Sequence, residues 1–162
     1  MSVESQTKPL IHIVDDDESM RQALIELLQA TGFSAIGYAS TGDFLLNPLP
    51  DQHGCILLDV QLPGPSGLEL QAALLRKGVA LPIIFLTGHA DVPSTVRAMK
   101  AGAVDFLEKP VNRGTLLEAL RRALEADTAR RSALAAVNRH QARLVLRLRE
   151  LIVQRRAFPL NR

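Results

Sequence analysis

Short apolar runs alternate with longer amphipathic segments along most of the chain. The apolar runs are too short for helices and are bounded by turn residues, so they predict strands. The five predicted strands lie at residues 10–14, 33–38, 55–58, 81–86 and 104–107. Because the run at 55–58 is apolar at every position, it predicts a central strand that is buried on both faces.

Amphipathic segments with helix caps follow these strands. Ser66 and Glu69 form a capping box, in which each residue's side chain satisfies a backbone N–H of the other. The predicted helices are a segment at 20–28 that Gly32 ends, one from about Thr41 to Leu46, one from Ser66 to about Lys77, one from Asp91 to Ala101, and a last one capped by Asn112. This alternation predicts an α/β fold with a doubly wound, five-stranded parallel sheet and helices on both faces.

Charged and hydroxyl side chains follow four of the predicted strands. Along the chain they are Asp15, Asp16, Asp17, Asp59, Thr87 and Lys109. The carboxyl ends of parallel strands meet at one edge of a sheet, and ligands of doubly wound folds bind there. We therefore expect acids, a hydroxyl and an amine to meet at this edge.

This set of side chains predicts phosphoryl-transfer chemistry. Converging carboxylates repel one another unless a hard cation lies between them, and Mg²⁺ prefers such oxygen ligands. A metal ion together with an ammonium group neutralises the oxygens of a phosphoryl group in transfer, and a threonine hydroxyl can donate to one of them. Asp59, at the end of the central strand, is the best-placed nucleophile for an aspartyl phosphate.

The sequence lacks the motifs of other enzymes that bind nucleotides or phosphate. A dinucleotide-binding turn needs glycines where the chain has residues 15–19, and the GxxxxGK[ST] motif of P-loops is absent. Haloacid-dehalogenase phosphotransferases need a second acid two positions after the nucleophile, where Gln61 stands. We therefore expect a phosphoacceptor that is not a turnover enzyme.

Composition and charge divide the chain into two parts. It has 162 residues, of which 47% are hydrophobic, and a net charge of +2, which suits one globular domain with a short remainder. Residues 1–120 carry 8 basic and 14 acidic side chains, whereas residues 121–162 carry 11 arginines and 3 acids. The basic part could attract nucleic acid or an acidic partner. Residues 1–9 lack the apolar centre of a secretory signal, and no apolar stretch is long enough to cross a bilayer, so we expect a cytoplasmic protein without membrane contact.

The edge residues, in their order, resemble the receiver domain of two-component response regulators. The resemblance is carried by VDDDE at 14–18, LLDVQLP at 57–63, Ser66-Gly67, LTGH at 86–89 and DFLEKP at 105–110. It covers residues 8–126, and the sequence of residues 87–110 is most similar to the FixJ-type branch. The resemblance implies a CheY-like sheet with strand order 2-1-3-4-5. Residues 127–162 are then a basic helical extension.

The resemblance also implies the metal and phosphate ligands. Asp59 would accept a phosphoryl group from a sensor histidine kinase. Asp16 and Asp59 would bind Mg²⁺, or alternatively Mn²⁺, directly, Asp15 would bind it through water, and Gln61 through its backbone carbonyl. Lys109 would contact the phosphate.

Further implied features concern the output of the signal. Pro110 would follow a cis peptide bond. Thr87 and Phe106 would form a switch pair, in which the hydroxyl moves toward the phosphate and the ring fills the space that it leaves. The signal would leave by the face formed by the helix after Asp91, the strand at 104–107 and the last helix, which would also support a homodimer.

Taken singly, each motif has a simpler interpretation. Residues 15–18 suit a solvated helix start, and Thr87-Gly88 and Lys109-Pro110 suit turns. Their joint register favours the phosphoacceptor interpretation over a binding module that needs no phosphorylation. Cys55 and His12 fit core packing, whereas His89 either tunes dephosphorylation or has no role.

The extension has a heptad pattern. From Leu116, eight of eleven positions spaced alternately by four and three residues are apolar; the exceptions are Asp127, Arg130 and Gln141. The pattern predicts that the last helix continues outward as a dimerising coiled coil. A single frayed helix is the alternative, and the alternation at 144–148 also suits a strand.

The extension is too short for a DNA-binding domain. FixJ-type regulators continue into a helix-turn-helix domain of about 60 residues, and only 22 residues follow position 140. We expect DNA binding only through an output domain missing from this chain. Either the chain is a truncated transcription factor, or it is a stand-alone receiver that acts through protein contacts made by its helical extension.

Overall fold

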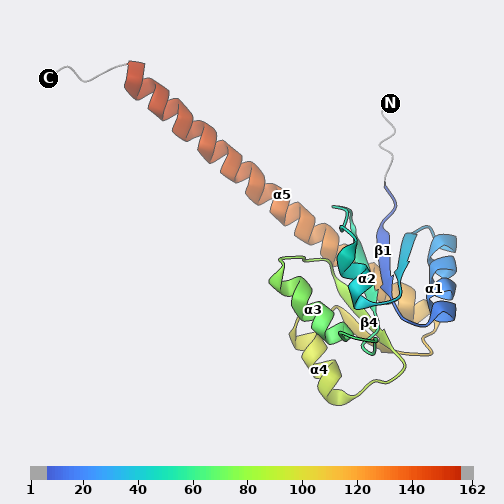
Figure 1. The fold of residues 1–162 in the computed structure, drawn as a ribbon. Helices are drawn as coiled ribbons and strands as arrows, with labels where there is room; N and C mark the ends of the chain where they lie inside the picture. Colours follow the sequence, from blue (N-terminus) through green and yellow to red (C-terminus); the bar gives the residue numbers. More distant parts are fainter. Residues whose placement is uncertain (1–6, 158–162) are drawn as a thin grey trace. The chain divides into compact units, whose positions relative to one another are not determined.

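Strands and helices alternate along residues 7–157, which the computed structural model describes (Figure 1). The strands are β1 (Leu10–Val14), β2 (Ser34–Tyr38), β3 (Gly54–Leu58), β4 (Ile83–Thr87) and β5 (Asp105–Glu108). The helices are α1 (Glu18–Ala30), α2 (Thr41–Leu46), α3 (Gly67–Arg76), α4 (Val92–Lys100) and α5 (Arg113–Ala157). The α/β alternation predicted from the sequence is confirmed.

The strands form one parallel sheet in the order β2-β1-β3-β4-β5. The predicted doubly wound topology is therefore confirmed, with β3 at its centre. Every residue of β1, β3 and β4 is buried, because apolar runs of this kind can be covered by helices on both faces.

The predicted caps start the helices. Ser66 and Glu69 form both hydrogen bonds of the capping box at the start of α3. The Asn112 side chain accepts from the backbone N–H of Thr115 at 2.7 Å, and the Asp91 side chain accepts from that of Ser94 at 2.8 Å. These short-range signals fix where each helix begins.

Two apolar clusters pack on the two faces of the sheet. One joins the sheet to α2, α3 and α4 through residues such as Phe44, Leu70 and Ala98. The other joins it to α1 and α5 through Leu28 and Leu120. Cys55 lies in this second cluster, where burial and the Asp127 carboxylate raise the pKa of its thiol. Its predicted role as a core residue is confirmed.

The first part of the heptad pattern serves this core and not a second copy. Leu116, Leu120 and Ala123 are buried against the sheet, so the prediction that they belong to a dimerising stripe is wrong. An amphipathic helix packed on its own sheet has nearly the same apolar spacing as a coiled coil. The sequence pattern alone could not separate the two uses.

The Asp127 side chain continues the same buried face. It is fully buried, and its Oδ2 accepts from the backbone N–H of Gly54 at 3.1 Å and lies 2.7 Å from His53 Nδ1. Gly54 is also the residue whose Cβ would collide with the backbone of Leu10, so β1 and β3 meet closely here. Asp127 therefore fixes α5 to the amino end of β3.

The chain divides into two units after Asp127, Met1–Asp127 and Thr128–Arg162. In the second unit α5 is helical to Ala157, without a break at residues 144–148, and every residue from 132 to 157 is exposed. None of the helices in the described part of the chain is long and apolar enough to cross a membrane.

We expect His12, in the centre of β1, to make the fold less stable in acid. Its ring is buried between Tyr38 and Phe44, its Nδ1 lies 3.1 Å from the Tyr38 hydroxyl, and burial lowers its pKa to about 4. At pH below its ordinary value of 6.5 the unfolded chain binds a proton that the folded chain does not. The free energy of unfolding should therefore fall from pH 6.5 downward, by about 3 kcal/mol at pH 4 and below.

Urea unfolding between pH 4 and 7 measures this effect. In His12→Gln the fall in the free energy of unfolding that is due to this histidine should disappear. In His140→Gln, a change at an exposed position, the same fall should persist. Parallel pH profiles for the parent chain and His12→Gln would contradict the prediction.

Candidate functional site

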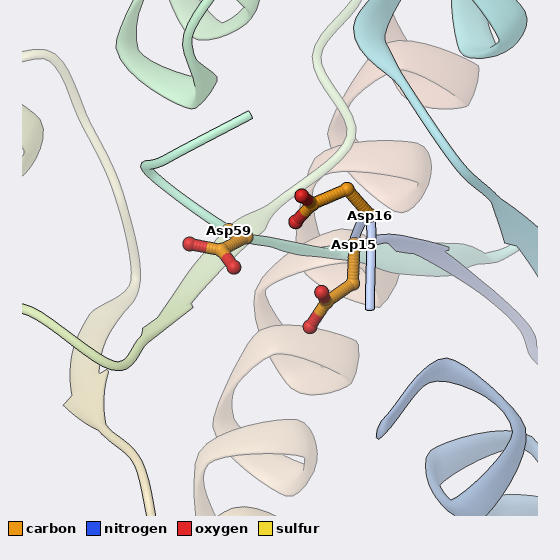
Figure 2. Close-up of side chains that lie close together, drawn as sticks. All are labelled: Asp15, Asp16 and Asp59. Carbon is orange, nitrogen blue, oxygen red and sulfur yellow. The ribbon is translucent and has the colours of Figure 1, made fainter. Parts of the chain in front are cut away.

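Three carboxylates meet at the carboxyl end of the sheet (Figure 2). Asp15 and Asp16 follow β1, and Asp59 follows the neighbouring strand β3. Each offers an oxygen, and these oxygens all lie within 4.8 Å of one another. Asp15 and Asp59 are buried and Asp16 is exposed, so the cluster is a half-open group of negative charges.

Lys109 brings a positive charge to two of these acids. Its Nζ donates to Asp15 Oδ2 at 2.6 Å and to Asp59 Oδ2 at 3.2 Å. Burial acts to lower the pKa of Lys109, but its hydrogen bonds and charge interactions with Asp15 and Asp59 outweigh burial and raise it. The ammonium group is therefore charged at neutral pH. The Lys109-Pro110 peptide bond is cis, as predicted.

Backbone groups hold Asp59 in place. The N–H of Gln61 donates to Asp59 Oδ1 at 3.0 Å. The first residue of α3, Gly67, passes so close that a Cβ on it would lie 2.1 Å from the carbonyl oxygen of Asp59. The predicted Ser66-Gly67 motif thus has a steric reason, because only glycine permits this approach.

The predicted switch residues lie on the neighbouring strands β4 and β5. Thr87 is fully buried, and its Oγ1 accepts from the backbone N–H of His89 at 3.3 Å. The Phe106 ring is half-buried, with its centre 5.6 Å from that of Phe85. The backbone N–H of Lys109 donates to the Thr87 carbonyl at 2.7 Å, which joins the end of β4 to the lysine.

The acidic cluster has the chemistry of a divalent-cation site. All three side chains offer oxygen, which Mg²⁺ and Mn²⁺ prefer, and the exposed Asp16 leaves one side open to water. Asp16, Gln61, Gly88 and Lys109 line the same open cleft. The carboxylates that could hold a cation, the Lys109 ammonium group and an opening to solvent therefore lie together.

Arg21 is a site residue that the sequence pattern did not reveal. It lies on α1, and its Nη1 donates to the backbone carbonyl of Asp15 at 2.8 Å. Its side chain crosses β2 at Gly37, where a Cβ would lie 2.8 Å from the arginine stem. The contact holds the backbone that carries the Asp15 and Asp16 side chains. A glycine inside a strand was the one available signal.

Arg21→Gln should weaken Mg²⁺ binding about tenfold, because residues behind metal ligands set the ligands' positions. Calorimetric titration with MgCl₂ measures the dissociation constant. Arg76→Gln, at the exposed end of α3, is the matched control and should bind like the parent chain. An affinity of Arg21→Gln within about twofold of the control would contradict this role.

Comparisons with known proteins agree with this arrangement. Residues 11–121 match the family model described as response regulator receiver domain. Nodulation protein W of Bradyrhizobium diazoefficiens is 47% identical over 130 residues, which are 80% of this chain and 57% of that protein. The transcriptional regulatory protein FixJ of Azorhizobium caulinodans is 43% identical over 114 residues, 70% of this chain and 54% of that protein. The chain spans about half the length of these relatives.

Solved structures extend the comparison to three dimensions. The response regulator StyR superimposes with a TM-score of 0.79 at 42% identity, over 83% of this chain and 68% of that chain. The crystal structure of FixJ-N gives a TM-score of 0.68 at 41% identity, over 73% of this chain and 94% of that chain.

Proposed function

The chain belongs to the response regulator receiver domain family, and we propose that Asp59 accepts a phosphoryl group from a sensor histidine kinase. The observation that carries the proposal is the meeting of Asp59 with two further carboxylates and the Lys109 ammonium group. A vestigial binding module would have no need of this charge arrangement.

The side chains divide the work of the transfer. One Asp59 oxygen attacks phosphorus, an O–P bond forms, and the N–P bond of the phosphohistidine breaks, its electron pair returning to the imidazole nitrogen, which takes up a proton. Lys109 neutralises a phosphoryl oxygen, and the Thr87 hydroxyl donates to another. The protein keeps the product on itself, so the reaction is self-catalysed transfer followed by autodephosphorylation and not turnover of a substrate.

A divalent cation completes this chemistry. Asp16 and Asp59 would bind Mg²⁺ or Mn²⁺ directly, Asp15 through water, and Gln61 through its backbone carbonyl. When bound, the cation would supply positive charge in addition to that of Lys109 and would offset the repulsion among the acids.

The face formed by α4, β5 and α5 would carry the signal to a homodimer partner. Val92, Val96 and Met99 lie exposed at four- and three-residue spacing on α4, which supports a contact surface there. Arg122 of α5 pairs with Asp105 of β5 and links two elements of this face. We place Phe106 of β5 as the partner of Thr87 in the switch.

Phosphorylation by a small donor tests the proposal. Incubation with acetyl phosphate and MgCl₂ should add one phosphoryl group, and peptide mapping should place it on Asp59. Excess EDTA should prevent the reaction. Labelling of another residue, or labelling that survives the chelator, would refute it.

Two outputs are consistent with a receiver. Control of transcription, as the name of the FixJ relative indicates for that protein, would require DNA-binding residues outside this sequence. The alternative is a receiver that acts through protein contacts alone, for which the exposed helical extension offers apolar side chains. The reading frame downstream of Arg162 distinguishes the two.

A further inference from the structure

We propose that residues 134–152 of α5 pair with the same segment of a second copy, parallel and in register. This inference deepens the proposed function, because it specifies how the proposed homodimer joins its helical extensions. It is carried by one stripe of exposed side chains and by the position of one glutamine within that stripe.

The stripe has the spacing of a two-stranded coiled coil. Its core positions are spaced alternately by three and four residues. Val145 and Ile152, each beside a core position, make the stripe as wide as the apolar face of a packed helix. The apolar members are Leu134, Val137, Leu144, Val145, Leu148, Leu151 and Ile152, each 46–60% exposed. Arg130 and Arg155 occupy the next positions of the same stripe, so it ends with a charge on each side. The 19 residues from Leu134 to Ile152 span about 28 Å of helix.

The charged side chains of the extension lie outside this apolar stripe. Residues 128–157 contain eight arginines and one glutamate, and apart from Arg130 and Arg155 none of these stands at a core position. Arg139, Arg143 and Glu150 lie on the opposite side of the helix. Nucleic acid or an acidic protein would bind the arginines and leave the apolar stripe exposed. A second copy offers an uncharged stripe of the same length, and the pairing closes as a symmetric dimer.

Gln141 selects the orientation of the pair. It is the one polar residue at the core positions from Leu134 to Leu151. In a parallel, in-register pair its amide faces the same amide of the second copy, which can both donate and accept a hydrogen bond. In the antiparallel pair that aligns the two stripes, it would face Val145 and Leu144 and lose its partners. Parallel pairing is therefore the arrangement without an unsatisfied buried amide.

Disulfide trapping in the full chain tests the orientation. Leu134→Cys and Ile152→Cys are made separately in a Cys55→Ala background. Parallel pairing predicts that Leu134→Cys forms a dimer with itself under mild oxidation, and that a mixture of the two variants forms no mixed dimer. Leu146→Cys, on the other side of the helix, is the control and should not cross-link. Efficient mixed dimers without self-cross-linked Leu134→Cys would establish antiparallel pairing and overturn the inference.

Sedimentation separates this inference from the proposed phosphotransfer. Each variant is measured with and without acetyl phosphate, and phosphorylation is scored by mass. A dimer that cross-links at position 134 supports the pairing even if Asp59 is never phosphorylated. A chain that remains monomeric at about 100 µM in both states overturns the pairing, even if Asp59 is phosphorylated.

Discussion

Replacement of Asp59 by asparagine should abolish phosphorylation, lowering the labelled fraction at least about 100-fold with acetyl phosphate or a phosphohistidine donor. An amide oxygen is a far weaker nucleophile than a carboxylate and binds a divalent cation less tightly. The amide oxygen can still accept from the Gln61 backbone N–H, which Asp59 Oδ1 now does at 3.0 Å. We therefore expect the free energy of unfolding to change by no more than about 1 kcal/mol.

Asp17→Asn is the matched control for this experiment. Asp17 is a neighbouring acid that caps α1 by accepting from the backbone N–H of Met20, and asparagine is an equally good cap. It lies outside the group of three carboxylates whose oxygens lie within 4.8 Å of one another. If Asp17→Asn is fully phosphorylated and Asp59→Asn is not, the reaction is assigned to the Asp59 carboxylate. Equal labelling of both variants would rule out Asp59 as the acceptor.

Lys109→Met should slow phosphorylation about 10²–10³-fold, the usual cost of removing one fixed positive or donor group that faces developing charge. Methionine keeps the length and apolar stem of the side chain but cannot contact a phosphoryl oxygen. The change also removes the Lys109 Nζ, which now lies 2.6 Å from Asp15 Oδ2 and 3.2 Å from Asp59 Oδ2. The initial rate of labelling at saturating MgCl₂ measures the effect.

Lys100→Met controls for the loss of a positive charge. Lys100 is the exposed last residue of α4, and its replacement changes the net charge by the same amount. The rate of Lys100→Met should equal that of the parent chain. If Lys109→Met retained more than about a tenth of the parent rate, Lys109 would not be the phosphate contact.

The sequence predicted the sheet and the meeting of the site residues for a simple physical reason. Each apolar run is a strand, and side chains that follow parallel strands gather at one edge. Asp15, Asp59 and Lys109, far apart in sequence, could therefore be placed together before their distances were known. Their roles in phosphoryl transfer remain predictions.

Contacts that depend on how separate elements pack were beyond the sequence. Arg21 donates to the backbone carbonyl of Asp15, and because every residue has a carbonyl, the sequence around Asp15 does not reveal the contact. Leu120 and Leu148 obey one heptad pattern, yet the first is buried in the core and the second is exposed. The period of a helix shows that a face is apolar, but not what covers that face.

The buried carboxylate of Asp127 sets the shortest receiver that can be studied alone. The family match ends at residue 121, but a fragment cut there would lack Ala123 of the core and the acceptor that now serves the Gly54 N–H. That N–H belongs to β3, the strand that directly precedes Asp59. A fragment ending at residue 121 would therefore report the phosphorylation of a receiver with a damaged central strand, whereas one that includes Asp127 keeps it intact.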